Sequence, residues 1–194
     1  MNIRTLLLSL LILTLTFSAS YSYSASQKVP NELRSLLKDT INSTSSFNDR
    51  FEAEVWLLDM STRLSRWVKK PEERLFILKT VHHAANEAGV QPELVLAIMQ
   101  IESSFDRFAL SSVGARGLMQ IMPFWKKEIG RSQDNLFTIK TNLRYGCTIL
   151  KYYLDKEKGD FIKGLARYNG SYRSNRYPEK VLLAWEKNWF YSYQ

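Results

Sequence analysis

A single glutamate at the end of an apolar helical segment has the clearest potential for acid–base chemistry in this sequence. The segment from Pro92 to Glu102 reads PELVLAIMQIE, so Glu102 follows a run of aliphatic side chains. A carboxyl group in such surroundings loses hydration, which favours its neutral form and raises its pKa toward the range of a general acid. The alternative is a glutamate at a helix end that simply faces water, and its position alone does not decide between the two.

An amide inside a second apolar run is the next candidate. Gln120 lies in the run LMQIM, which follows a turn-rich link containing Ser111, Gly114 and Gly117 and is closed by Pro123. A buried amide without hydrogen-bond partners costs about 1–3 kcal/mol. We therefore expect Gln120 to bind either a polar ligand or a nearby backbone group.

The histidines and the cysteine do not predict a metal site. His82 and His83 are the two histidines of the chain, and His83 pairs with Glu87 at helical spacing, but no third ligand and no His-Glu-x-x-His pattern accompany them. Cys147 is the one cysteine, so no internal disulfide can form, and its place on an apolar helical stripe predicts a small buried side chain. We expect no metal and no cofactor.

Several motifs occur in a fixed order along the chain. They are Glu102-Ser103, Ser111 nine residues after the glutamate, Gly114-Ala115-x-Gly117-Leu118-Met119-Gln120-Ile121-Met122-Pro123, Asn142-Leu143-x-x-Gly146-x-x-x-Leu150, and Ala166-Arg167-Tyr168-Asn169-Gly170. Together they resemble the signature of the soluble lytic transglycosylase family, lysozyme-like enzymes that cleave the glycan strands of peptidoglycan. The resemblance extends from about Glu72 to Pro178. A tyrosine that this family often carries downstream of the last proline is absent.

The resemblance implies a set of site residues. Glu102 would be the catalytic residue, and the substrate-binding residues would be Ser111, Met119, Gln120, Met122, Tyr168 and Asn169. Among these, Tyr168 is expected to donate a hydrogen bond to the catalytic carboxyl group, and the two methionines to line the cleft.

The resemblance also implies a reaction. Protonated Glu102 would donate to the oxygen of the β-1,4 linkage between N-acetylmuramic acid (MurNAc) and N-acetylglucosamine (GlcNAc). The resulting carboxylate would then take the proton of the C6 hydroxyl as a 1,6-anhydro ring closes. Two alternatives stay open: a lysozyme-type muramidase that uses water, and a non-catalytic peptidoglycan-binding protein.

Charge and the N-terminal segment indicate where the protein acts. The net charge of +8 favours an anionic partner, but the basic residues form only short clusters without the long run of a nucleic-acid arm.

Residues 1–26 combine Arg4, an apolar stretch from Leu6 to Phe17 and small residues, which predicts a secretory signal peptide. We therefore expect a periplasmic or secreted protein of the bacterial cell envelope. Its expected partner is peptidoglycan rather than nucleic acid, and no stable membrane insertion is expected once the signal is removed. An uncleaved membrane anchor is the alternative.

The apolar pattern predicts an all-α, lysozyme-like protein. We expect a signal peptide over 1–26, an N-terminal helical extension over 27–70, and the catalytic domain over 71–194. The predicted helices cover 31–42, a segment beginning at a cap residue Asn48, 71–88, 92–102, 124–129, 139–156, 161–168 after the cap residue Asp160, and about 178–189. A small hairpin is expected near 111–121.

Two finer expectations concern packing. The helix after Asn48 should turn Phe51, Val55, Trp56, Leu58 and Leu64 inward. Gly146, inside the 139–156 helix, costs up to about 1 kcal/mol relative to alanine, and a close helix–helix crossing would explain its presence.

Overall fold

The computed structural model describes residues 37, 40, 47 and 49–191. Asn31–Gln194 forms one compact unit, and the description below concerns this unit. The signal peptide predicted for residues 1–26 and most of the helix predicted over 31–42 lie outside the described residues.

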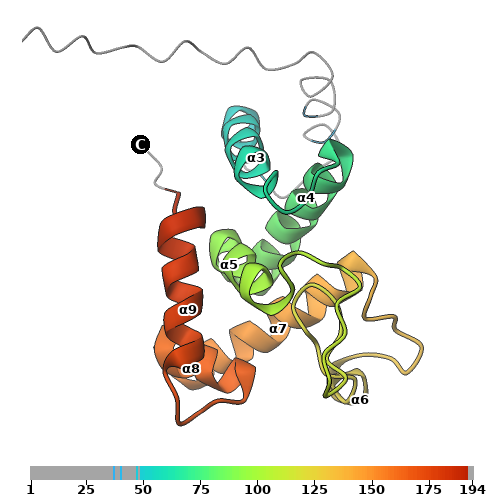
Figure 1. Ribbon diagram of the computed structural model, residues 1–194, viewed down its shortest axis with the longest axis vertical. Helices are drawn as coiled ribbons and strands as arrows, with labels where there is room; N and C mark the ends of the chain where they lie inside the picture. The colour runs from blue at the N-terminus through green and yellow to red at the C-terminus, as the bar shows by residue number, and fades with distance from the viewer. Residues whose placement is uncertain (1–36, 38–39, 41–46, 48, 192–194) are drawn as a thin grey trace, which may run out of the picture. The chain divides into compact units, whose positions relative to one another are not determined.

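The regular secondary structure of the described residues is helical, as the sequence predicts (Figure 1). The helices are α3 (Arg50–Leu64), α4 (Pro71–Ala88), α5 (Pro92–Ser103), α6 (Trp125–Ile129), α7 (Ile139–Lys156), α8 (Phe161–Asn169), α9 (Arg176–Ala184) and a π-helical turn η1 (Trp185–Trp189). Within residues 49–191, strand-like pairing is limited to two bridges, Leu110–Arg116 and Arg116–Ile121, in the predicted hairpin. None of the helices described is long and apolar enough to cross a membrane.

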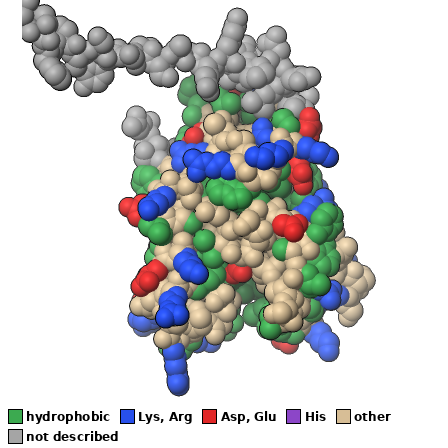
Figure 2. Space-filling model, in the orientation of Figure 1, with side chains coloured by type: hydrophobic (Ala, Val, Ile, Leu, Met, Phe, Trp, Pro, Cys, Tyr) green, Lys and Arg blue, Asp and Glu red, His purple; other side chains and the backbone are tan. Residues whose placement is uncertain are grey.

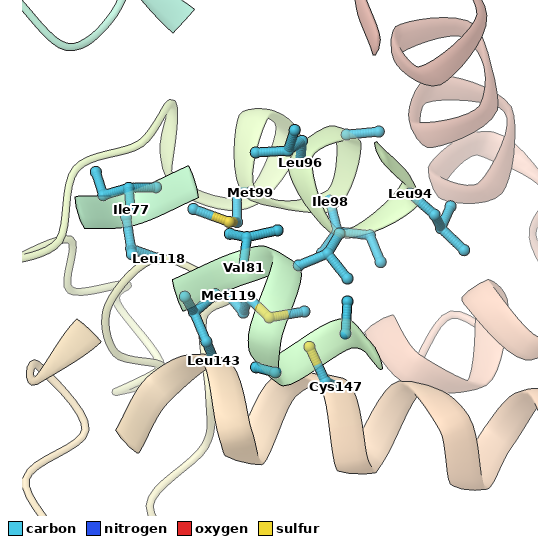
Figure 3. Packing of buried hydrophobic residues seen from close by; sticks show 14 of the residues in the cluster. Ile77, Val81, Leu94, Leu96, Ile98, Met99, Leu118, Met119, Leu143 and Cys147 are labelled. Atoms are coloured by element: carbon cyan, nitrogen blue, oxygen red, sulfur yellow. The ribbon is translucent and has the colours of Figure 1, made fainter. Parts of the chain in front are cut away.

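Helix α5 lies at the centre of this unit, in contact with α4, α9 and η1. Pro92 occupies its first turn, and Glu93, next to it, accepts a hydrogen bond from Trp56 Nε1 at 2.6 Å. Six consecutive residues, Leu94–Met99, are fully buried. Figure 3 shows Leu94, Leu96, Ile98 and Met99 packed among side chains of α4 and α7. Because this apolar helix is enclosed by its neighbours, its last turn is held in a fixed position.

The orientation of α3 corrects part of the prediction. Asn48 lies outside the described residues, and the helix is capped by Asp49, whose carboxylate accepts from Glu52 N at 2.9 Å. Phe51 is 75 % exposed and Val55 39 % exposed. Both fall off the buried stripe, which has three- and four-residue spacing and consists of Ala53, Trp56, Leu57, Met60 and Leu64.

Gly146 on α7 accommodates a side chain rather than a second helix. A Cβ atom at this position would lie 2.1 Å from Met119 Sδ, so the predicted helix–helix crossing is wrong and the hairpin supplies the contact. The next residue, Cys147, is fully buried as predicted, and burial raises the pKa of its thiol to about 12 because the thiolate would be poorly solvated there.

Asn142 joins the hairpin to α7. Its side chain is 1 % exposed; Oδ1 accepts from Met119 N at 2.8 Å, and Nδ2 donates to Arg116 O and Leu136 O, each at 2.8 Å. One amide thus satisfies three backbone groups from segments that form no regular sheet. The hairpin therefore depends on a side chain of α7 for its position.

Replacing Asn142 with alanine should cost about 2–5 kcal/mol of unfolding free energy, because three backbone groups lose their partner in a buried setting. Lys140→Ala, on the exposed part of the same helix, should change stability by less than about 0.5 kcal/mol. Urea titration of both variants measures the difference. A wild-type stability for Asn142→Ala would show that the amide does not hold the hairpin.

Candidate active site

One pocket of about 260 Å³ gathers residues from distant parts of the chain. Its lining consists of Glu102, Ser111, Val113, Ala115, Gln120, Ile121, Met122, Trp125, Ile149, Tyr168 and Asn169. Figure 2 shows a hollow on this face of the molecule, between the side of α8 and α9 and the loop that carries α6. Six of the seven residues singled out from the sequence line this pocket, and Met119 does not.

Glu102 lies in the last turn of α5, half-buried, with its carboxyl group at the pocket. Burial raises the pKa of this carboxyl, and hydrogen bonds from Tyr177 and Asn169 oppose that rise by stabilising the carboxylate. Tyr177 donates to Glu102 Oε1 at 2.7 Å. The direction of the shift agrees with the expectation from the apolar segment, and it keeps a proton on the group at higher pH than usual.

The tyrosine that contacts Glu102 is a different one from that predicted. Tyr168 donates instead to Met119 O at 2.8 Å, so the predicted bond between Tyr168 and the carboxyl is wrong. Tyr177 is buried in the first turn of α9, directly before Pro178, and sequence reasoning missed it because it sought a tyrosine after that proline. A buried tyrosine hydroxyl needs a hydrogen-bond partner. Here the partner lies 75 residues away along the chain.

Both tyrosines remain proton donors. The pKa of Tyr168 and that of Tyr177 are raised well above 10, first by burial and then by the nearby charge of Glu102. A neutral hydroxyl is therefore present at Glu102 throughout the physiological pH range, and it donates to whichever state the carboxyl adopts.

Met119 lies beneath the pocket rather than on its wall, which corrects the prediction that it lines the cleft. Its side chain is fully buried against Gly146. Met119 and Gln120 lie in the turn of the hairpin, where Met119 packs against α7 and Gln120 lines the pocket. Met122 lies at the pocket, half-buried, as predicted.

The amide nitrogen of Gln120 binds backbone groups of its own hairpin. It donates to Gly117 O at 3.0 Å and to Ala109 O at 3.2 Å. Gln120 also has a left-handed backbone (φ 47°), a conformation that non-glycine residues rarely adopt and that costs about 1–3 kcal/mol. The sequence left two partners open for this amide, a polar ligand or a nearby backbone group. The amide nitrogen binds backbone groups.

Two serines fix the ends of the hairpin. Ser111 lines the pocket, and its Oγ accepts from Ala115 N at 3.0 Å, which closes the turn. Ser103, next to Glu102, donates to Leu118 O at 2.8 Å. This bond joins the helix end that carries Glu102 to the hairpin.

The histidines lie away from this pocket. His82 is buried and stacked on Phe47 at a centroid distance of 3.5 Å, and burial lowers its pKa to about 4. His83 Nε2 lies 3.4 Å from Glu87 Oε1 on the exposed side of α4. No group of three or more His, Cys, Asp or Glu residues in the described part of the chain is placed to hold a metal ion.

Comparison with known proteins assigns the family. The model of the transglycosylase SLT domain matches residues 79–181, more than half of the chain and the whole of the pocket lining. The chain belongs to this family. A transglycosylase of Enterobacteria phage PRD1 is 32 % identical over 111 residues, which cover 54 % of this chain and 41 % of the phage protein.

A second relative is the membrane-bound lytic murein transglycosylase C of Mannheimia succiniciproducens, 46 % identical over 97 residues, which cover 45 % of this chain and 26 % of the relative. This SLT-family chain therefore matches less than half the length of either relative.

A crystal structure with a similar fold is that of an inactive mutant of the lytic transglycosylase Slt from Pseudomonas aeruginosa. The TM-score is 0.52 at 19 % identity, covering 78 % of this chain and 36 % of that one. At this identity the likeness concerns the fold alone. It confirms, with the family match, the predicted all-α, lysozyme-like fold of the SLT type.

Tyr177→Phe should raise the pKa of Glu102, because the variant loses a hydrogen bond that stabilises the carboxylate. Tyr168→Phe is the matched control: it removes a similarly buried hydroxyl whose partner is a backbone carbonyl, and should leave the titration close to wild type. Carbon-13 NMR of labelled glutamate side chains, assigned with Glu102→Gln, measures both. A larger shift in the Tyr168 variant would contradict the assignment.

Glu102→Gln should stabilise the protein increasingly as the pH rises. The folded-state pKa of Glu102 lies above its ordinary value of 4.5, so between the two values the unfolded chain binds fewer protons and wild-type stability falls with pH. The glutamine variant carries no such cost. Thermal unfolding of the two proteins below pH 4 and at pH 8 tests this, and a difference that shrinks toward pH 8 would contradict it.

Proposed function

We propose that this protein is a peptidoglycan lytic transglycosylase that cleaves the β-1,4 linkage between MurNAc and GlcNAc and leaves 1,6-anhydroMurNAc ends. The observation that carries the proposal is a proton-retaining carboxyl, Glu102, at a pocket within the segment that the family model matches. The names of the relatives, a transglycosylase and a lytic murein transglycosylase, support the same reaction class.

In the first step, protonated Glu102 donates its proton to the linking oxygen, and the bond between that oxygen and C1 of MurNAc breaks. The substrate's own 2-acetamido group relieves the positive charge that develops at C1. Glu102 is then a carboxylate, which the Tyr177 hydroxyl stabilises from 2.7 Å. Burial thus favours the protonated carboxyl group at the start, and the hydrogen bond from Tyr177 favours the carboxylate that follows.

In the second step, the carboxylate takes the proton of the C6 hydroxyl while O6 bonds to C1. This closes the anhydro ring, returns Glu102 to its protonated form and consumes no water. Ser111, Gln120, Met122, Tyr168 and Asn169 would hold the sugar in this pocket. Met119 would contribute through its backbone carbonyl, which positions Tyr168.

The lining of the pocket supports a mechanism with one carboxyl group. Glycosidases with two catalytic carboxylates place them about 5–9.5 Å apart on either side of the bond. Glu102 is the one Asp or Glu among the described residues that line the pocket. Asp106, the nearest acid along the chain, lines a different hollow, and its carboxylate accepts from Phe108 N at 2.9 Å.

We place the protein in the bacterial cell envelope, where peptidoglycan is found. The secretory signal predicted over residues 1–26 supports a periplasmic or secreted location, and the net charge of +8 suits a substrate whose peptide stems carry carboxylates.

Incubation of the protein with isolated sacculi should release muropeptides with anhydro ends, which mass spectrometry distinguishes from reducing ends by one water. Glu102→Gln should lower the rate by about 10²–10⁴-fold, the usual contribution of a general acid–base group, while binding to sacculi persists. Glu186→Gln, an exposed carboxyl on η1, is the control and should act as wild type. Reducing ends would indicate the muramidase alternative, and unaltered lysis by Glu102→Gln would contradict the mechanism.

The rate should also depend on pH through Glu102. Because the free enzyme must carry the proton, kcat/KM should fall as the pH rises past the raised pKa of this group. Tyr177→Phe should move that alkaline limb to higher pH while lowering the maximal rate, since the carboxylate intermediate loses a donor. An alkaline limb at the same pH in both proteins would assign it to another group.

A further inference from the structure

Two arginines outside the pocket stack on a pair of phenylalanine rings. The Arg107 guanidinium carbon lies 4.8 Å from the ring centre of Phe108, and that of Arg116 lies 5.8 Å from the ring centre of Phe137. The two rings lie 6.4 Å apart. Arg107, Phe108, Phe137 and Arg116 therefore form a continuous row, which we call the arginine–phenylalanine ladder.

The side chains of both ladder arginines lack a hydrogen-bond or ion-pair partner within the described part of the chain. The Nε atom of each is buried and without an acceptor. Other arginines of this unit do have partners: Arg63 pairs with Asp59, Arg74 donates to backbone carbonyls, and Arg167 pairs with Glu157. A planar guanidinium held against a ring, with its donors unused, is suited to bind a planar oxyanion such as a carboxylate.

None of the four ladder residues lines the pocket, but one end of the ladder lies next to it. Arg116 follows Ala115 and is bridged to Ile121, and both of these residues line the pocket. At its other end the ladder meets a second hollow, which Arg107 and Phe108 line with Lys69 and Lys70.

This second hollow contains charges of both signs. Glu73 and Asp106 line it beside the three basic residues, so its net charge is small and positive. Figure 2 shows Lys and Arg side chains gathered in a band over α3 and the start of α4, above it. The combination of basic and aromatic groups favours an organic carboxylate over an inorganic anion.

We infer that the arginine–phenylalanine ladder binds carboxylate groups of the peptide stems that branch from the glycan strand in the pocket. The inference rests on the proposed function. Each guanidinium would donate two parallel N–H bonds to one carboxylate, while the phenylalanine rings contact the adjacent apolar part of the peptide. The glycan itself carries the bond to be cleaved, and the stems supply the negative charge that the chain's basic surface attracts.

The geometry of a hairpin makes this contact feasible. Adjacent strands lie about 5 Å apart, and an extended peptide spans up to about 3.3–3.6 Å per residue. A stem of a few residues can therefore extend from the pocket across the hairpin to the ladder. The exposed side chains of Leu110 (65 %) and Val113 (73 %) on this hairpin offer apolar contacts along the way.

The test measures binding of two soluble probes: glycan strands that retain their peptide stems, and the same strands after an amidase has removed them. All proteins carry Glu102→Gln so that the probes stay intact. Arg107→Met and Arg116→Met should each weaken binding of the stem-bearing probe by about 10-fold, the effect of one lost charge-assisted pair. Binding of the stem-free probe should be unchanged. Arg50→Met, at an exposed position on α3, is the matched control and should affect neither probe.

Two further measurements separate the proposal from general electrostatic attraction. Arg107→Lys and Arg116→Lys keep the charge but lose the planar fork, so they should remain several-fold weaker than the parent protein. Chemical amidation of the stem carboxylates should abolish the difference between parent and methionine variants. Full recovery with lysine, equal losses on both probes, or equally tight binding of duplex DNA at the same salt concentration would overturn the proposal.

The outcomes also distinguish this inference from the proposed function. If the protein with Glu102 intact releases anhydro muropeptides but the ladder variants show no dependence on the stems, the ladder proposal alone fails. If no anhydro products form, the proposed function fails whatever the ladder binds.

Discussion

The buried amide of Asn142 fixes the position of the hairpin against α7. It binds the backbone of Met119, Arg116 and Leu136, and so attaches to α7 a hairpin that has almost no sheet pairing of its own. The carbonyl of Met119 in turn accepts from Tyr168 on α8. A polar side chain inside the core thus connects three segments of the chain, and the pocket is formed where they meet.

The state of Glu102 results from two opposing effects. Burial at the end of α5 disfavours the charged carboxylate, whereas hydrogen bonds from Tyr177 and Asn169 favour it. In the proposed mechanism this group first gives up a proton and then takes one back, so neither effect alone would suit it. Burial alone would raise the pKa and weaken the acid, whereas hydrogen bonds alone would lower the pKa and weaken the base.

The hairpin contributes to two places with different chemistry. Ser111, Ala115 and Gln120 line the pocket, whereas Arg116 stacks on Phe137 outside it. The glycines and the left-handed Gln120 allow this short segment to turn sharply. The proposed substrate, a branched polymer with a neutral backbone and charged side chains, matches this division.

The sequence by itself determined the helices and most of the residues that line the pocket with Glu102, because apolar periodicity, caps and a contiguous motif are local signals. Tertiary structure decided which tyrosine reaches Glu102, since Tyr177 and the carboxyl group meet only after α9 packs on α5. It also placed Met119 under the pocket floor and left Phe51 in solvent, because helix rotation and side-chain direction follow from what each face packs against. Long-range packing has no signature in local spacing, and for that reason these contacts could not be predicted from the sequence.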